Sequence, residues 1–204
     1  KINVLKKLNY NFKKGKIYSL VGPSGSGKST FLNILSLIDR PSSGNLIINN
    51  EKINFDKIEN NDQLRSNNFG IIYQEKNLLN DFTALENISL AGIANGKSYI
   101  ESQKLAYAIL KKLKLTNRSN HFPSELSGGE NQRIAIGRAL VNSPNIILAD
   151  EPTGNLDSEN SEIISEILFN YVKEEGSSLI MVTHDEKLAD KAQRKIKIKD
   201  GKIE

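Results

Sequence analysis

The sequence predicts an α/β fold with a mainly parallel sheet, an antiparallel β edge and an inserted helical subdomain. Runs of β-branched and apolar residues alternate along the chain with segments of helical pattern. The last ten residues, KIKIKDGKIE, alternate apolar and charged side chains around Asp-Gly, which is typical of a hairpin. Between about residues 74 and 127 the strand signal vanishes, and apolar residues recur at helical spacing.

The strand-like runs occupy residues 16–21, 45–50, 69–73, 145–150 and 177–183. Because helical patterns lie between several of these runs, we expect crossover connections that make neighbouring strands parallel. Ligands of such sheets gather at the carboxyl ends of the strands. We therefore expect functional residues where the apolar runs end.

The helical stretch contains two candidate helix starts. TALE (83–86) and SYIE (98–101) each have the spacing of a capping box. We therefore expect one domain over residues 1–204, with an α/β core of about 1–73 and 131–204 and a helical subdomain of about 74–130.

Composition excludes several classes of site. With 204 residues, 38% of them hydrophobic, the chain can bury a substantial core. It has no cysteine, which excludes disulfides, thiolate metal sites and a cysteine nucleophile and suits the cytosol. The net charge of +4 comes from scattered lysines, so no nucleic-acid partner is expected. The longest apolar runs are too short to cross a bilayer, and the start KINVLKK is not typical of a signal peptide.

The segment GPSGSGKST directly follows the apolar run IYSLV. Its spacing is that of a phosphate-binding loop, which predicts a P-loop NTPase core; the alternative is a flexible Gly/Ser turn. Glycines allow the backbone N–H groups to approach phosphate oxygens. The candidate nucleotide-binding residues are Gly22, Pro23, Ser24, Gly25, Ser26, Gly27, Lys28, Ser29 and Thr30. We expect Lys28 to contact the β- and γ-phosphates and the Ser29 hydroxyl to bind Mg²⁺.

Asp150 and Glu151 follow the apolar run IILA. Adjacent carboxylates are often only a solvated strand end. After a phosphate-binding loop, however, Asp150 is expected to organise Mg²⁺ and Glu151 to polarise the attacking water. His184 ends another apolar run, at the same predicted edge of the sheet, whereas His121 lies in a loop and is interpreted as structural.

The segment LSGGENQRIAIGRAL contains a capping box formed by Ser127 and Glu130, followed by an amphipathic pattern. A helix cap alone would explain the box. Adjacent glycines weaken a helix by about 1 kcal/mol each, however, so Gly128 and Gly129 suggest that something approaches the backbone. A second anion is the natural candidate.

Taken together, these motifs resemble the nucleotide-binding subunit of an ATP-binding-cassette (ABC) transporter over essentially the whole chain. In the family's order they are Walker A (GPSGSGKST), the Q-loop at Gln74, the signature LSGGE, Walker B (IILAD, then Glu151), the D-loop GNLD and the switch histidine His184. Within the family, YQEKNLLNDFTALENI, LSGGENQR and ADEPTGNLDS look most like the ATPase of the bacterial lipoprotein-releasing system, close to macrolide exporters and the cell-division ATPase.

The resemblance implies an ATPase that forms a head-to-tail homodimer around ATP. Each ATP would lie between Walker A of one subunit and Ser127, Gly128 and Gly129 of the other, with Asp157 coupling the two sites. Gln74 would bind Mg²⁺ and pass the motion to integral membrane subunits at the cytoplasmic face of the bacterial inner membrane. The aromatic residue that stacks on adenine is expected to precede Lys1, because Tyr10 lies past the matching position.

Other classes fit less well. A chromosome-organising ATPase would need a long coiled coil between Thr30 and Leu126, and a translation-factor ATPase would carry two cassettes, whereas one phosphate-binding loop is present. A non-hydrolysing binding module would not require Gln74, Glu151 and His184 together. The cargo and the direction of transport belong to other chains.

Overall fold

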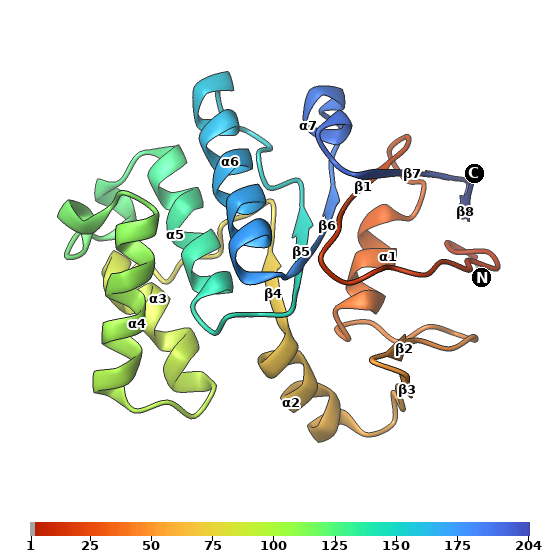
Figure 1. Cartoon of the computed structure of the whole chain (residues 1–204), viewed down its shortest axis with the longest axis horizontal. Coiled ribbons are helices and arrows are strands. Elements are labelled where there is room, and N and C mark those ends of the chain that lie inside the picture. Colours follow the sequence, from red (N-terminus) through yellow and green to blue (C-terminus); the bar gives the residue numbers. More distant parts are fainter. Residues whose placement is uncertain (1–2) are drawn as a thin grey trace.

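The computed structural model describes residues 3–204, which form a six-stranded sheet with helices on both faces and a group of helices at one end (Figure 1). The strand order is β4-β5-β6-β1-β7-β8, and every neighbouring pair is parallel except β7 with β8. The strands are β1 (Ile17–Val21), β4 (Phe69–Ile72), β5 (Ile146–Asp150), β6 (Ser178–Val182), β7 (Arg194–Lys199) and β8 (Lys202–Ile203). The predicted fold class, including the antiparallel edge hairpin, is confirmed.

The helices lie in three places. Helix α1 (Lys28–Leu35) covers one face of the sheet, and α6 (Ser158–Glu175) and α7 (Glu186–Asp190) cover the other. Helix α2 (Ile58–Asn68) leads into β4, while α3 (Ala84–Ala94), α4 (Tyr99–Lys112) and α5 (Gly128–Leu140) form the helical subdomain. Short 3₁₀ turns, η1 (Thr116–Arg118) and η2 (Pro123–Glu125), connect α4 to α5.

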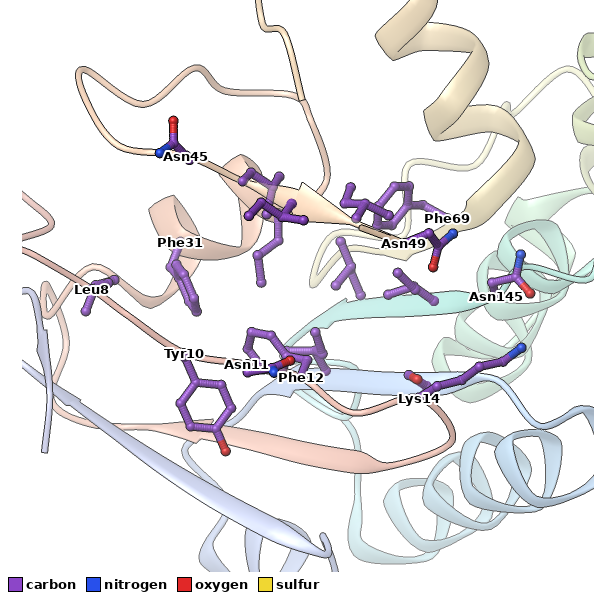
Figure 2. Close-up of a pocket in the computed structure, with 18 of the residues that line it drawn as sticks. Leu8, Tyr10, Asn11, Phe12, Lys14, Phe31, Asn45, Asn49, Phe69 and Asn145 are labelled. Atoms are coloured by element: carbon purple, nitrogen blue, oxygen red, sulfur yellow. The ribbon is translucent and has the colours of Figure 1, made fainter. Parts of the chain in front are cut away.

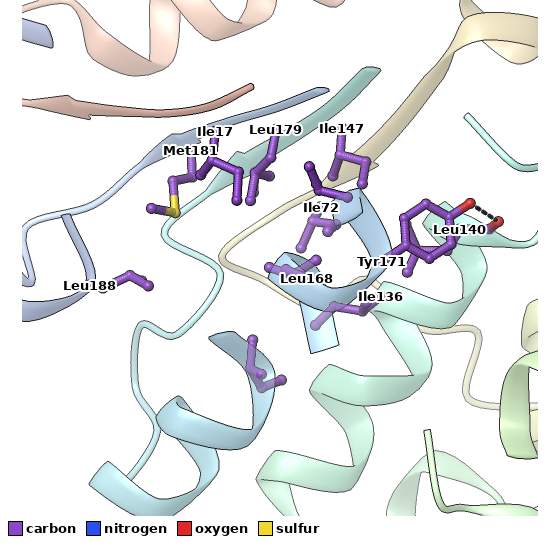
Figure 3. Close-up of a cluster of buried hydrophobic side chains, with 13 residues drawn as sticks. Ile17, Ile72, Ile136, Leu140, Ile147, Leu168, Tyr171, Leu179, Met181 and Leu188 are labelled. Carbon is purple, nitrogen blue, oxygen red and sulfur yellow. Dashed lines mark hydrogen bonds between the residues drawn. The ribbon is translucent and has the colours of Figure 1, made fainter. Parts of the chain in front are cut away.

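The central strands are apolar on both faces because both faces are covered. In β6, Leu179 and Met181 belong to the cluster under α5, α6 and α7, whereas Ile180 and Val182 belong to the cluster under α1. Figure 3 shows the first cluster, in which Tyr171 of α6 donates its hydroxyl hydrogen to the carbonyl of Leu140. The two layers fix the sheet, so the residues at its carboxyl edge have a rigid base.

The expected strand at 45–50 is shorter than predicted and lies outside the main sheet. β2 (Ile47–Ile48) pairs only with β3 (Glu51–Lys52), in an antiparallel hairpin. Asn49 and Asn50 form its turn with φ values of 51° and 67°, the left-handed conformation that two-residue hairpin turns require. Helix α2 was not predicted, because its residues show no apolar stripe and only Asn61 is buried.

The helical subdomain has its own apolar cluster, which α3, α4 and α5 share. Thr83 forms the predicted capping box with Glu86, while Ser98 accepts a hydrogen bond from the backbone N–H of Glu101 as a simple cap. Helix α5 contributes to this cluster and also to the cluster beneath α6. It therefore connects the core with the helical subdomain, and the division of the chain near residue 130 remains a proposal.

Candidate functional site

The phosphate-binding loop joins β1 to α1 in a conformation that needs glycine. Gly22, Gly25 and Gly27 have φ values of 149°, 74° and 101°. A Cβ on Gly22 would overlap the carbonyl oxygen of Ile198 in β7, so the loop can lie against this strand only without a side chain. Gly27 is the N-cap of α1, so the loop ends at a helix N-terminus, where backbone N–H groups favour anions.

Lys28 is the first residue of α1, and its side chain folds back over the loop. The Nζ donates to the carbonyl oxygens of Gly22 at 2.9 Å and Pro23 at 3.0 Å. The ammonium group therefore lies within the curve of the loop, beside the N-terminus of α1. Both features provide positive potential for a polyphosphate.

Two strand ends bring the other charged groups to this loop. Asp150 is the last residue of β5, and the backbone N–H of Glu151 continues the pairing by donating to Val182 of β6 at 3.0 Å. His184 follows β6, and its Nδ1 lies 2.8 Å from Oε2 of Glu151, which also accepts the backbone N–H of His184 at 3.3 Å. The Glu151 side chain is 14% exposed and that of His184 is 73% exposed, so the histidine can reorient without unpacking the core.

Glu151 has a left-handed backbone conformation, with a φ of 48°. Such a conformation is uncommon for a residue other than glycine, asparagine or aspartate, and strained residues of this kind cluster at functional sites. It turns the chain sharply after β5 and leaves the carboxylate facing His184. The conformation is thus part of what aims this side chain.

The oxygen donors Ser29, Gln74 and Asp150 line the same pocket as Lys28. Burial is the main cause that raises the pKa of Asp150, and a hydrogen bond from Ser29 opposes it. In residues 3–204 no group of three His, Cys, Asp or Glu side chains could hold a metal by itself. A hydroxyl, an amide and one carboxylate suit Mg²⁺, which commonly completes its shell with water and substrate phosphates.

We expect Asp150→Asn to raise the Tm of the protein at pH 7 in the absence of nucleotide and Mg²⁺. Burial raises the pKa of Asp150 in the folded state above its value in the unfolded chain. The contribution of Asp150 to the free energy of unfolding therefore falls as the pH rises through the raised pKa. The difference in Tm should shrink in acid, where wild-type Asp150 is protonated. Thermal unfolding from pH 4 to 8 measures it, with exposed Asp81→Asn as control. An equal or lower Tm at pH 7 would contradict the prediction.

The pocket gathers most, but not all, of the predicted residues. Those that line it are Gly22, Ser24, Gly25, Gly27, Lys28, Ser29, Thr30, Gln74, Asp150, Glu151 and His184. Pro23 takes part through its carbonyl, and the hydroxyl of Ser26 is buried without a hydrogen-bond partner in residues 3–204. Ser127, Gly128, Gly129 and Asp157 are not among the lining residues. Within one chain, the signature and D-loop residues therefore remain apart from the phosphate-binding loop.

The two glycines of the signature segment have different surroundings. Ser127 caps α5 and forms the predicted capping box with Glu130. Gly128 is exposed, and a Cβ on it would have only the Lys76 Nζ nearby, at 3.9 Å. Gly129 is buried, and a Cβ on it would overlap the side-chain amide of Asn160. An approaching anion is therefore not needed to explain Gly129, because the side chain of Asn160 in the same chain already occupies the place of a Cβ.

Sequence reasoning missed polar side chains that hold the site together. The guanidinium of Arg138 in α5 donates to the carbonyls of Asn77 at 2.6 Å and Lys76 at 2.9 Å, which fixes the segment after Gln74. Gln132, also in α5, donates to the carbonyl of Pro152 at 3.0 Å. These bonds join segments far apart in sequence, so no local pattern could have indicated them.

A second pocket lies near the opposite edge of the sheet (Figure 2). It is lined by the segment from Leu8 to Lys14, by α1, and by residues at the starts of β4, β5 and β6. Aromatic side chains of Tyr10, Phe12 and Phe31 gather along it, and none of its lining residues is an acid or a histidine. It therefore differs from the pocket at the carboxyl ends of the strands, which Asp150, Glu151 and His184 line.

No helix in residues 3–204 combines the length and the apolar character that crossing a membrane requires.

A phosphate-binding loop that shares one pocket with Asp150, Glu151 and His184 at the carboxyl edge of a parallel sheet, together with a capped helix at the signature segment, is typical of an ATP-binding cassette. The chain belongs to the ABC transporter family, whose model matches residues 5–154. It is 44% identical over 204 residues to the lipoprotein-releasing system ATP-binding protein LolD of Treponema denticola, a match covering 100% of this chain and 90% of that protein. These findings confirm the resemblance inferred from the motifs.

Two further similarities bear on function. The macrolide export ATP-binding/permease protein MacB of Mannheimia succiniciproducens is 46% identical over 202 residues, covering 99% of this chain and 31% of that protein. A dimeric structure of the ATP-binding cassette MJ0796, bound to ADP and Pi, matches with a TM-score of 0.91 at 42% identity, covering 100% of this chain and 89% of that one. The chain is accordingly an ATP-binding ABC ATPase of a transporter.

Proposed function

We propose that this ATPase powers lipoprotein release from the bacterial inner membrane, acting on the cytoplasmic face through integral membrane subunits. The single observation that carries the ATPase chemistry is the pocket that brings Lys28, Asp150, Glu151 and His184 together. Support for lipoprotein release comes from the LolD relative, which this chain matches over its whole length. The alternative is the ATPase of a macrolide or peptide exporter, which the MacB relative favours, or of the cell-division complex.

In the proposed mechanism, backbone N–H groups of the phosphate-binding loop bind the phosphates of ATP, and Lys28 contacts the β- and γ-phosphates. Glu151 accepts a proton from the attacking water, while His184, hydrogen-bonded to Glu151, holds that carboxylate toward the phosphate. Ser29, Gln74 and Asp150 would hold Mg²⁺, which neutralises phosphate charge when it is bound. The left-handed backbone of Glu151 keeps its carboxylate at the end of β5.

The proposed catalytic unit is a homodimer. Ser127 and Gly128 are exposed and are not among the residues that line the pocket of their own chain. A second subunit, placed head to tail, would bring them to the γ-phosphate and complete a site that one chain leaves open. The dimeric MJ0796 cassette, which is bound to ADP and Pi, supports this arrangement. Asp157 would then lie near the subunit interface.

Stimulation of ATP hydrolysis tests the proposed function. The protein is reconstituted in proteoliposomes with the membrane subunits encoded beside it, and ATPase activity is measured with a triacylated lipoprotein, the same protein without its acyl chains, or a macrolide. We expect stimulation only by the acylated form. Stimulation by the macrolide alone would favour the exporter. Lys28→Ala is the matched inactive control, because the phosphates lose their charge partner.

A further inference from the structure

The side chain of Asn160 lies between the D-loop (Gly154–Asp157) and helix α5, here called the signature helix. Asp157 is the N-cap of α6, and its Oδ1 accepts the backbone N–H of Asn160 at 2.8 Å. Its Oδ2 accepts the side-chain Nδ2 of Asn160 at 2.7 Å. Both hydrogen bonds favour the ionised form and hold the pKa of Asp157 below its ordinary value. The carboxylate is thus fixed by one residue through two bonds.

The other end of the Asn160 amide lies against the signature helix. A Cβ built on Gly129 would overlap Oδ1 and Cγ of Asn160. The amide could avoid an added methyl group only by rotating away, and this would break its bond to Asp157. A helix cap alone explains the bond from the backbone of Asn160, but neither the Nδ2 bond nor the close approach to Gly129.

A second link joins the same two segments. Gln132, one turn further along the signature helix, is 2% exposed and donates to the carbonyl of Pro152. Pro152 lies directly after Glu151, and Asn160 lies beyond the D-loop. The segment from Glu151 to Asn160 is therefore attached to the signature helix at two points on either side of the D-loop.

We propose that Asn160 is a positioning residue that fixes the D-loop to the signature helix, and that Gly129 lacks a side chain in order to receive Asn160. The D-loop and the signature helix then move as one body when the subunits close on ATP. Gly128, whose side-chain position is open, remains the glycine that another subunit can approach. The expected effect on catalysis rests on the proposed function, whereas the contact between Asn160 and Gly129 does not.

The contact is tested by thermal unfolding of the full chain without nucleotide. We expect Gly129→Ala to lower the Tm by about 4 °C or more, because the added methyl group overpacks the site. In the Asn160→Ala background the same change should lower the Tm by less than about 1 °C. Gly128→Ala is the matched control and should not lower the Tm. If Gly129→Ala does not fold, recovery of folding in the double variant supports the proposal. An equal loss in both backgrounds, or no recovery, overturns it.

The positioning role is tested by steady-state ATP hydrolysis. Asn160→Ala should lower kcat at least about 5-fold and leave the KM for ATP within about 2-fold. Asn160 contacts Asp157 of the D-loop and is not among the residues that line the nucleotide pocket. Exposed Glu159→Ala, at the neighbouring position of α6, should keep kcat within about 2-fold. An unchanged kcat for Asn160→Ala overturns the positioning role. A wild-type chain without ATPase activity would instead contradict the proposed function, and the unfolding measurements would still decide the contact.

Discussion

Glu151→Gln is expected to retain ATP affinity and to slow hydrolysis by at least about 10²-fold, the loss typical of a missing general base. The substitution keeps the shape of the side chain, and the amide oxygen can still accept the hydrogen bonds from Nδ1 and the backbone N–H of His184. The pocket should therefore remain intact, and only the ability to take a proton from water is lost. Nucleotide titration and single-turnover hydrolysis measure the two effects separately.

ATP should hold this variant together as a dimer, because binding is retained while the step that separates the subunits is slow. Light scattering with and without ATP follows the association. Exposed Glu159→Gln provides a control with the same chemical change outside the pocket, and it should turn over ATP normally. Normal turnover by Glu151→Gln would remove this carboxylate from the role of base. Loss of ATP affinity would instead mean that the residue is needed to form the pocket.

Local patterns sufficed to predict the main sheet. The apolar runs that became β1, β5 and β6 are buried on both faces, that of β4 is buried on one face and half-buried on the other, and the Asp-Gly turn before β8 is a local signal. Helix α2 lacks such a signal, because its buried face is reduced to Asn61, which donates to the carbonyl of Asn54. The predicted strand at 45–50 has residue types typical of a strand, but its local pattern does not indicate that β2 pairs with β3 outside the main sheet.

The pocket was predictable for a similar reason. Lys28, Asp150 and His184 each end or follow an apolar run, and parallel strands bring such positions to one edge. The contact of Asn160 with Gly129 and the hydrogen bonds of Gln132 and Arg138 were not predictable in this way, because each joins segments distant in sequence. Gly129 illustrates the difference: the residue type was noticed from the sequence, but the neighbour that can account for it is visible only in the fold.

A tandem fusion tests whether each ATP site is shared between two subunits. Two copies of the chain are joined by a flexible Gly/Ser linker, and Lys28→Ala is combined with a substitution in the signature segment. Gly128→Asp is preferred to a change at Gly129, because a side chain at Gly129 would collide with Asn160 in its own subunit. A Cβ at position 128 would have only the flexible Lys76 Nζ nearby, at 3.9 Å, and the helix dipole favours an aspartate in the first turn. Its carboxylate would nevertheless repel a γ-phosphate brought by the partner.

With Lys28→Ala in one copy and Gly128→Asp in the other, the shared arrangement places both defects in one site and leaves the second intact. Single-turnover hydrolysis should then survive, even if steady turnover requires both sites. With both substitutions in the same copy, each shared site carries one defect, so hydrolysis should fall at least about 10²-fold further, in line with the loss of charge stabilisation of the transferred phosphate. Circular dichroism of both fusions confirms equal folding. A site contained within one chain predicts the opposite order, so faster hydrolysis by the fusion with both changes in one copy would reject the head-to-tail dimer.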